Sequence, residues 1–198
     1  MPRLRSKATR MVTSAAAAVV LYLFSATGAG AYGGHYVFVG GTPAQRAVVV
    51  AALDASRFDW SLVQQTVTIV LGPGLTTSAL PQTISIDSDL LDAGRFAWGP
   101  IQHEYAHVVD YSLLDPGMRA YLGQRLGGAS WWQEPGTPLP HGQLASERFA
   151  TEVAWSYWPS PSNSLKPSSA KDEGGSIAPR KFRLLLARLI HAPDLIDG

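Results

Sequence analysis

The chain has 198 residues, of which 46% are hydrophobic and 16% are charged, and this balance is typical of one compact domain with a real core. Four basic residues and no acidic ones fall within residues 1–31, so the remainder carries 12 basic against 15 acidic groups, a net charge of −3. A mildly acidic body gives no reason to expect nucleic-acid binding, and the absence of cysteine excludes disulfides, thiolate metal ligands and thiol nucleophiles.

Residues 1–31 have the three-part layout of a secretory signal peptide. A basic start is followed by an apolar run over residues 15–24, and residues 29–31 (Ala-Gly-Ala) then supply the small-residue pattern of a cleavage site. The apolar run is shorter than the roughly 20 residues that cross a membrane, and no cysteine follows it for lipid attachment. We therefore expect cleavage after Ala31, secretion of a single domain over residues 32–198, and no stable membrane span. The alternative is an uncleaved segment that anchors the domain outside the cytoplasm.

The first predicted elements of this domain are a strand over residues 35–39 and a helix over residues 43–56. Thr42 is the expected N-cap of the helix, with Pro43 in the first turn and Gln45 closing a capping box. The face expected to pack against the core consists of Ala47, Val48, Ala51, Ala52 and Ala55.

Two further strands are predicted from β-branched runs, at residues 66–71 and 83–86. The acidic run that follows, at residues 87–92, is interpreted as a turn and a helix cap. The next helix is expected to begin between Asp92 and Pro100, because proline is tolerated only near the start of a helix.

The second half of the chain is predicted to be mainly helical. A helix capped by Asp115 and Pro116 ends at Gly127-Gly128. Beyond it we expect an irregular loop, a helix, a mobile surface loop and a last helix, over residues 131–142, 144–158, 160–179 and 180–191. Strands early and helices late indicate an α+β fold, in which a small mixed sheet lies over the helices that carry the site.

Residues 103–107 read His-Glu-Tyr-Ala-His, and this spacing places two imidazoles and a carboxylate on one side of a helix. His103 and His107 lie one turn apart and can bind one divalent cation, most simply zinc. Glu104 lies between them, where it can take a proton from water instead of binding the metal. The alternative is an exposed helix with two solvated histidines, but the apolar residues that flank the motif favour a buried helix.

A catalytic zinc site usually has three protein ligands, so one more is expected from another element. The best candidate is Glu147 in the predicted 144–158 helix, because Ala150 and Ala154 would let this helix approach the first one closely. Glu152 is the competitor, and it lies about 140° around the helix from Glu147, so both cannot face the same ion. A further alternative leaves both glutamates on the surface.

Two stretches of the sequence resemble the gluzincin metallopeptidases. They are His-Glu-Tyr-Ala-His-Val-Val-Asp-Tyr, which begins at His103, and Ser-Glu-Arg-Phe-Ala, which begins at Ser146. The sequence is most similar to the compact minigluzincins and to the catalytic domain of anthrax lethal factor, and the resemblance covers mainly residues 95–158. It implies that Glu104 is the general base and acid and that zinc is held by His103, His107 and Glu147.

The resemblance also assigns features around the ion. It implies that the Thr83–Ile86 strand is a sheet edge above the cleft, where a peptide could add as a further strand. The lethal-factor type carries a tyrosine that steadies the oxyanion shortly before the third ligand, whereas this sequence has His141 near that place. His141 could replace the tyrosine as a hydrogen-bond donor, or it could be an ordinary loop histidine. We interpret Asp110, one turn beyond His107, as a hydrogen-bond partner of a histidine N–H.

The sequence therefore favours a secreted zinc-dependent endopeptidase that hydrolyses peptide bonds with water activated by Glu104. The expected cofactor is Zn2+, the expected partner is a peptide or protein substrate, and the expected state is a monomer. The alternative is a non-catalytic extracellular or envelope-associated binding module with a structural zinc site. The glutamate of the motif favours the enzyme, because a purely structural site has no need of a base.

Overall fold

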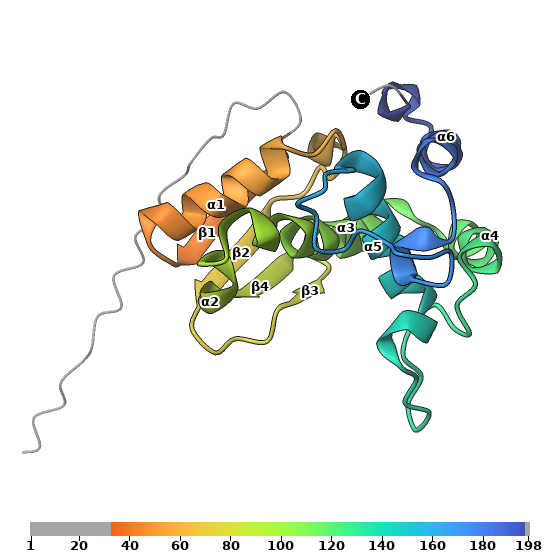
Figure 1. The fold of residues 1–198 in the computed structure, drawn as a ribbon, viewed down its shortest axis with the longest axis horizontal. Helices are drawn as coiled ribbons and strands as arrows, with labels where there is room; N and C mark the ends of the chain where they lie inside the picture. The colour runs from red at the N-terminus through yellow and green to blue at the C-terminus, as the bar shows by residue number, and fades with distance from the viewer. Residues whose placement is uncertain (1–32, 197–198) are drawn as a thin grey trace, which may run out of the picture.

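A computed structural model describes residues 33–196, so the predicted signal peptide lies outside the described residues (Figure 1). The strands are β1 (Tyr36–Gly40), β2 (Val67–Gly72), β3 (Ser78–Leu80) and β4 (Thr83–Asp87). The α-helices are α1 (Pro43–Asp54), α2 (Ser88–Leu91), α3 (Trp98–Leu113), α4 (Pro116–Leu126), α5 (Ala145–Tyr157) and α6 (Pro179–Leu189). Helices combined with a small mixed sheet confirm the predicted α+β fold. Within residues 33–196, no helix is long and apolar enough to cross a membrane.

The sheet has the strand order β1-β2-β4-β3, with β2 parallel to both β1 and β4 and with β3 antiparallel to β4. Side chains in β2 alternate between fully and partly buried, with Val67, Ile69 and Leu71 facing the core. The prediction that the Thr83–Ile86 strand forms a sheet edge is wrong, because β4 is paired on both sides. The edge strand is β3, whose three residues Ser-Ala-Leu lack the β-branched run by which strands are recognised in a sequence.

Helix α1 begins as its sequence predicts, but the predicted packing face is only partly right. The side chain of Thr42 accepts a hydrogen bond from the Gln45 backbone, and Gln45 returns one to the Thr42 backbone, which completes the capping box. The buried residues of the helix are Val49, Ala52 and Leu53, whereas Ala47, expected in the core, is exposed. Valine and leucine bury more apolar area than alanine, so the helix turns these larger side chains inward.

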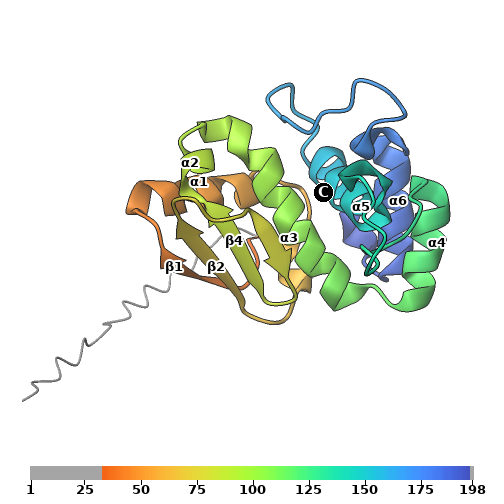
Figure 2. The ribbon, with the colours of Figure 1, turned by 90° about the horizontal axis from the view of Figure 1, so that it is seen from below.

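Helix α3 lies between two parts of the molecule (Figure 2). The sheet, α1 and α2 are on one side of it, and α4, α5 and α6 are on the other. Helix α5 packs along α3, and Ala150 and Ala154 on α5 are almost completely buried, as close helix packing requires. The prediction that both site-bearing helices lie under the sheet is therefore wrong for α5, which is separated from the sheet by α3.

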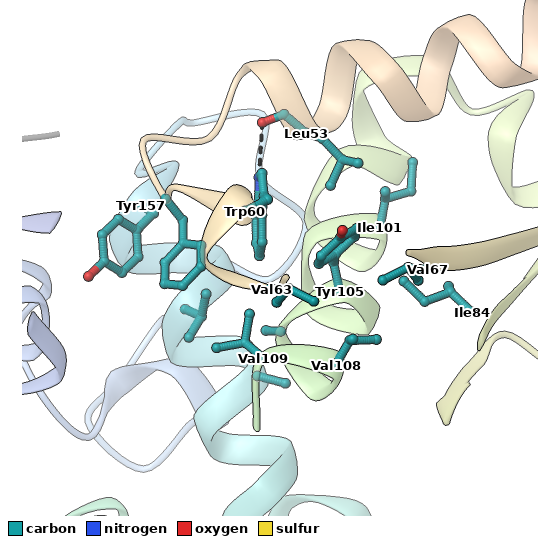
Figure 3. Packing of buried hydrophobic residues seen from close by; sticks show 14 of the residues in the cluster. Leu53, Trp60, Val63, Val67, Ile84, Ile101, Tyr105, Val108, Val109 and Tyr157 are labelled. Atoms are coloured by element: carbon teal, nitrogen blue, oxygen red, sulfur yellow. Dashed lines mark hydrogen bonds between the residues drawn. The ribbon is translucent and has the colours of Figure 1, made fainter. Parts of the chain in front are cut away.

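An aromatic cluster joins these two parts in the core (Figure 3). Trp60 is fully buried, and its indole N–H donates to the carbonyl of Leu53 at the end of α1, at 3.1 Å. Its ring lies 5.0 Å from that of Tyr105 on α3, measured between centroids. Phe58 packs beside Trp60 and contacts the ring of Tyr157 on α5 edge-on. This cluster fixes α3 and α5 relative to each other, and these two helices carry most of the site.

The segment over residues 160–179 is irregular, as predicted, but it is closely attached to α5. Asn163 is buried, and its side-chain amide donates to the carbonyl oxygens of Ala154 and Trp158. The guanidinium of Arg148 donates to the backbone carbonyl of Asp172 in the same segment. The prediction of a surface loop is thus incomplete, because part of the segment is packed into the structure next to the site.

Candidate metal centre

The His-Glu-x-x-His motif lies on α3, in a stretch where almost every residue is buried. His103, Glu104 and His107 are only 7%, 8% and 7% exposed, and they reach the surface at the base of a cavity of about 320 Å³. The alternative of an exposed helix with two solvated histidines is therefore wrong. Burial holds the three side chains in fixed positions, which a metal or catalytic site requires.

The ring nitrogens of both motif histidines converge on one carboxylate oxygen of α5. Nε2 of His103 is 3.1 Å from Oε2 of Glu147, and Nε2 of His107 is 3.0 Å from the same oxygen. The two Nε2 atoms are themselves 3.1 Å apart. Two neutral imidazoles that pointed their lone pairs at each other at this distance would repel, so the arrangement requires a proton or a cation close to both nitrogens.

His141 contacts the same oxygen from another element. It lies in the short 3₁₀ turn His141–Gln143, and its Nε2 is 3.0 Å from Oε2 of Glu147. Its side chain is 62% exposed, so it forms part of the rim of the cavity and not its floor. The ligand atoms of His103, His141 and Glu147 lie within 4.8 Å of one another, and this cluster could hold a metal ion.

Charge is concentrated on Glu147. Burial opposes its ionisation, but hydrogen bonds from His103, His107 and His141 outweigh the burial and lower the pKa of Glu147 far below its usual range. Hydrogen bonds to Glu147 and then to Glu173 raise the pKa of His141 to about 10. Glu147 is therefore ionised, and a partly buried carboxylate beside the imidazole nitrogens of His103 and His107 can attract a cation.

Glu104 faces the same cavity without joining the ligand cluster. Burial raises the pKa of Glu104, and the nearby His103 and His107 only partly oppose this effect. A carboxylate whose pKa is raised is a stronger base than one in water, as a general base requires.

The two candidate glutamates of α5 have different environments. Glu147 is in the cluster, whereas Glu152 is fully buried away from it and accepts a hydrogen bond from the backbone N–H of Ile177 at 2.8 Å. The alternative that leaves both glutamates on the surface is therefore wrong. The separation of about 140° around the helix accounts for the difference.

Asp110 does not pair with a histidine, and that prediction is wrong. Its Oδ1 accepts from the guanidinium of Arg119 at 2.7 Å, and its Oδ2 accepts from the indole N–H of Trp131 at 2.9 Å. Both partners come from later in the chain, and together they occupy both oxygens of the carboxylate.

Two residues that the sequence analysis did not identify support the histidine rings. The hydroxyl of Thr151 on α5 is 3.1 Å from Nδ1 of His103. Glu173 places Oε2 at 3.2 Å from that hydroxyl and Oε1 at 2.9 Å from Nδ1 of His141. Thr151 follows Glu147 by one helical turn, and this spacing could have indicated it. Nothing in the polar segment around Glu173 distinguishes that residue.

The walls of the cavity are formed by the sheet edge and by aromatic rings. Ser78 and Ala79 of the edge strand β3 line one side. Tyr111 and Trp132 line another, with their rings stacked at 5.0 Å between centroids and 8° from parallel. The cavity therefore offers an open strand edge and a flat apolar surface next to the ligand cluster.

Comparison of the chain with models of protein families, with curated proteins and with solved structures found no match. The geometry of the site is therefore the basis on which a function can be inferred.

Proposed function

We propose that the protein is a secreted zinc-dependent endopeptidase and that His103, His107 and Glu147 hold the metal. The supporting observation is the convergence of three ligand atoms at 3.0 to 3.1 Å from one another. Zinc with nitrogen and oxygen ligands at about 2.0 to 2.1 Å in tetrahedral geometry places neighbouring ligand atoms roughly 3.3 Å apart. Two imidazoles and a carboxylate are a known donor set for catalytic zinc, so the residues fit this ion.

Glu104 is the proposed general base and acid. Bound zinc supplies Lewis-acid chemistry and a lowered pKa for water. Glu104 takes the proton from water as it attacks the peptide carbonyl, and then gives that proton to the leaving amine. The buried position of its carboxyl group on the cavity side of α3 keeps the proton transfer away from bulk water.

The substrate is proposed to bind as an extended peptide along β3. This strand has a paired side toward β4 and a free edge at the cavity, so it can accept main-chain hydrogen bonds from a further strand. His141 on the rim is proposed to donate a hydrogen bond to the developing oxyanion. Its exposure and its place at the mouth of the cavity suit contact with a bound substrate.

A second candidate function is a non-catalytic binding module with a structural zinc site. The observation in its favour is a fourth possible ligand, because Nε2 of His141 also lies 3.0 Å from Oε2 of Glu147. Structural zinc sites have four protein ligands, whereas catalytic sites leave a position open. The two functions therefore differ in whether His141 binds the metal or the substrate.

Metal analysis combined with digestion of a peptide library separates these functions. The full-length protein, recovered from its expression host, is expected to contain one zinc ion and to cut peptides in a chelator-sensitive reaction. The Glu104→Gln variant is expected to retain the zinc and to lose about 10²- to 10⁴-fold of the cleavage rate. The control is Glu134→Gln, which changes an exposed carboxylate of the 131–142 loop.

Full activity in Glu104→Gln would refute the proposed mechanism. Zinc binding without any cleavage, together with unfolding on addition of chelator, would establish the structural role.

A further inference from the structure

Glu173 connects two histidines of the cluster, although it belongs to neither ligand-bearing helix. It begins the 3₁₀ turn Glu173–Gly175, in the irregular segment between α5 and α6. Its Oε1 is 2.9 Å from Nδ1 of His141, and its Oε2 is 3.2 Å from the hydroxyl of Thr151. That hydroxyl is in turn 3.1 Å from Nδ1 of His103.

The chemistry of the carboxylate gives this chain of hydrogen bonds a direction. An ionised carboxylate only accepts, so the hydroxyl of Thr151 donates to Glu173 and has its oxygen free to accept from Nδ1–H of His103. Nδ1–H of His141 donates to the other oxygen of Glu173. In both rings Nδ1 thereby carries a proton and is turned away from Glu147, and Nε2 is the ring nitrogen that faces Glu147.

We propose that Glu173 is a positioning residue that fixes the ring orientation of His103 and His141 and holds a proton on their Nδ1 atoms, so that both Nε2 atoms face Glu147. The effect of Glu173 on metal binding rests on the candidate metal site, and its effect on catalysis rests on the proposed function. Metal-binding histidines usually donate their other N–H to a carboxylate or a hydroxyl, and such partners raise the affinity of the site.

The structure holds Glu173 in place by packing on α5. A side-chain carbon added at Gly174 would lie 3.0 Å from Cγ2 of Thr151, so the turn contacts the helix with almost no space between them. Arg148 on α5 donates to the carbonyl of Asp172 at 3.3 Å and to the hydroxyl of Ser176 at 2.6 Å, on either side of the turn. The backbone that carries the Glu173 carboxylate is therefore held in place against α5.

The neighbouring Asp172 provides a matched control. Its carboxylate accepts hydrogen bonds from Ser168 and Ser169 within its own segment and contacts no residue of the cluster. Variants of these two adjacent acids therefore distinguish a loss of support for the histidines from a loss of order within the segment.

The experiment measures zinc affinity by competition with a chromophoric chelator, the visible spectrum of the cobalt-substituted protein, and kcat and KM for a cleaved peptide. Glu173→Ala is expected to weaken zinc binding about 10- to 100-fold, to change the cobalt spectrum and to lower kcat more than it raises KM. Glu173→Gln is expected to fall between this variant and the wild type, because the amide oxygen can still accept one of the two hydrogen bonds.

Two further variants complete the test, one that removes a single arm of the network and one that is the control. Thr151→Val, which removes the link to His103 alone, is expected to weaken zinc binding as well. Asp172→Asn is expected to leave both zinc affinity and the cobalt spectrum unchanged.

Wild-type zinc affinity and an unchanged cobalt spectrum in Glu173→Ala would overturn the positioning role, even if the wild type cleaves peptides. An equal loss in Glu173→Gln and in Asp172→Asn would also overturn it, because that result indicates disorder of the whole segment. Weakened zinc binding in Glu173→Ala, in a protein that cleaves no peptide, supports the positioning role and refutes the endopeptidase. A wild-type protein that binds no zinc overturns both.

Discussion

Asp110 on α3 and Arg119 on α4 form a hydrogen-bonded ion pair, with 2.7 Å between Oδ1 of Asp110 and Nε of Arg119. The carboxylate is fully buried, and its other oxygen accepts from Trp131. Arg119 also donates to the backbone carbonyl of Asp110 at 2.9 Å. Since Asp110 follows His107 by one turn, the pair ties this end of α3 to α4 and to the loop that carries the aromatic wall of the cavity.

Replacing Arg119 by methionine should therefore destabilise the protein by about 2 to 4 kcal/mol, because a buried carboxylate loses its charged partner. The measurement is the free energy of unfolding in urea. Arg125→Met on the same helix is the control, since its exposed guanidinium donates to the carbonyl of Tyr121 and lies over the ring of that residue. The control should cost less than about 1 kcal/mol. Equal losses in the two variants would show that the pair has no special role.

The proposed ligand set predicts unequal effects for the histidines. His107→Ala removes a buried ligand on α3 and should weaken zinc binding by at least about 100-fold, more than the loss of an outer-shell partner. His141→Ala removes an exposed side chain on the cavity rim and should weaken zinc binding by less than about 10-fold while lowering kcat. Isothermal titration with zinc and steady-state kinetics measure these effects, with the exposed His35→Ala as the control.

Loss of zinc in His141→Ala as complete as in His107→Ala would mean that His141 is a ligand. The site would then have four protein ligands, and the structural function would be favoured over the enzyme.

Gly128 controls how closely the start of α5 approaches the end of α4. A side-chain carbon added there would lie 2.5 Å from the backbone nitrogen of Ala145 and 2.7 Å from its Cα, so the backbone would have to move. Gly128→Ala should destabilise the protein by about 1 to 3 kcal/mol and should weaken zinc binding, because Glu147 lies two residues further along α5. Differential scanning calorimetry and zinc competition measure the two effects.

Gly123→Ala on α4 is the matched control. Its added carbon would lie 3.8 Å from the side chains of Ala145 and Trp131, an ordinary contact, and alanine favours the helix. This variant should be neutral or more stable by up to about 1 kcal/mol. If Gly128→Ala behaved in the same way, the close contact with α5 would not position Glu147.

Features with a short-range cause could be predicted from the sequence. The caps at Thr42 and Asp115 depend on residues within three positions, and both are confirmed by their hydrogen bonds. The acidic run over residues 87–92 was predicted to form a turn and a helix cap, and Asp87 caps α2. The spacing of His103 and His107 likewise defines one face of a helix before the fold is known.

Features that depend on contacts between distant segments could not be predicted. The edge position of β3 is set by pairing with β4, and three residues without a β-branched side chain give no strand signal. Asp110 was assigned to a histidine because both lie on one helix, but Arg119 and Trp131 occupy its oxygens. Glu173 reaches the cluster only because its segment folds back onto α5. The periodicity of a sequence does not predict a contact of this kind.

Glu152 predicts how stability depends on pH. Its side chain is fully buried. Burial raises the pKa of Glu152 to about 7, although hydrogen bonds from the backbone of Ile177 and Ser176 act to lower it. In the unfolded chain the group titrates near its ordinary pKa of 4.5. Between these values the folded protein binds the proton more tightly, so the stabilisation is complete below the unfolded pKa and is lost as pH rises through about 7.

Unfolding in urea at pH 5 and at pH 8 measures this effect. The wild type should lose on the order of 1 to 3 kcal/mol more between these two pH values than Glu152→Gln, which stays neutral and can still accept from the N–H of Ile177. All other titrating groups are common to the two proteins, so their contributions cancel in the difference. Parallel pH dependences would show that Glu152 is ionised in the folded protein throughout this range, which would require a cationic partner for its buried carboxylate.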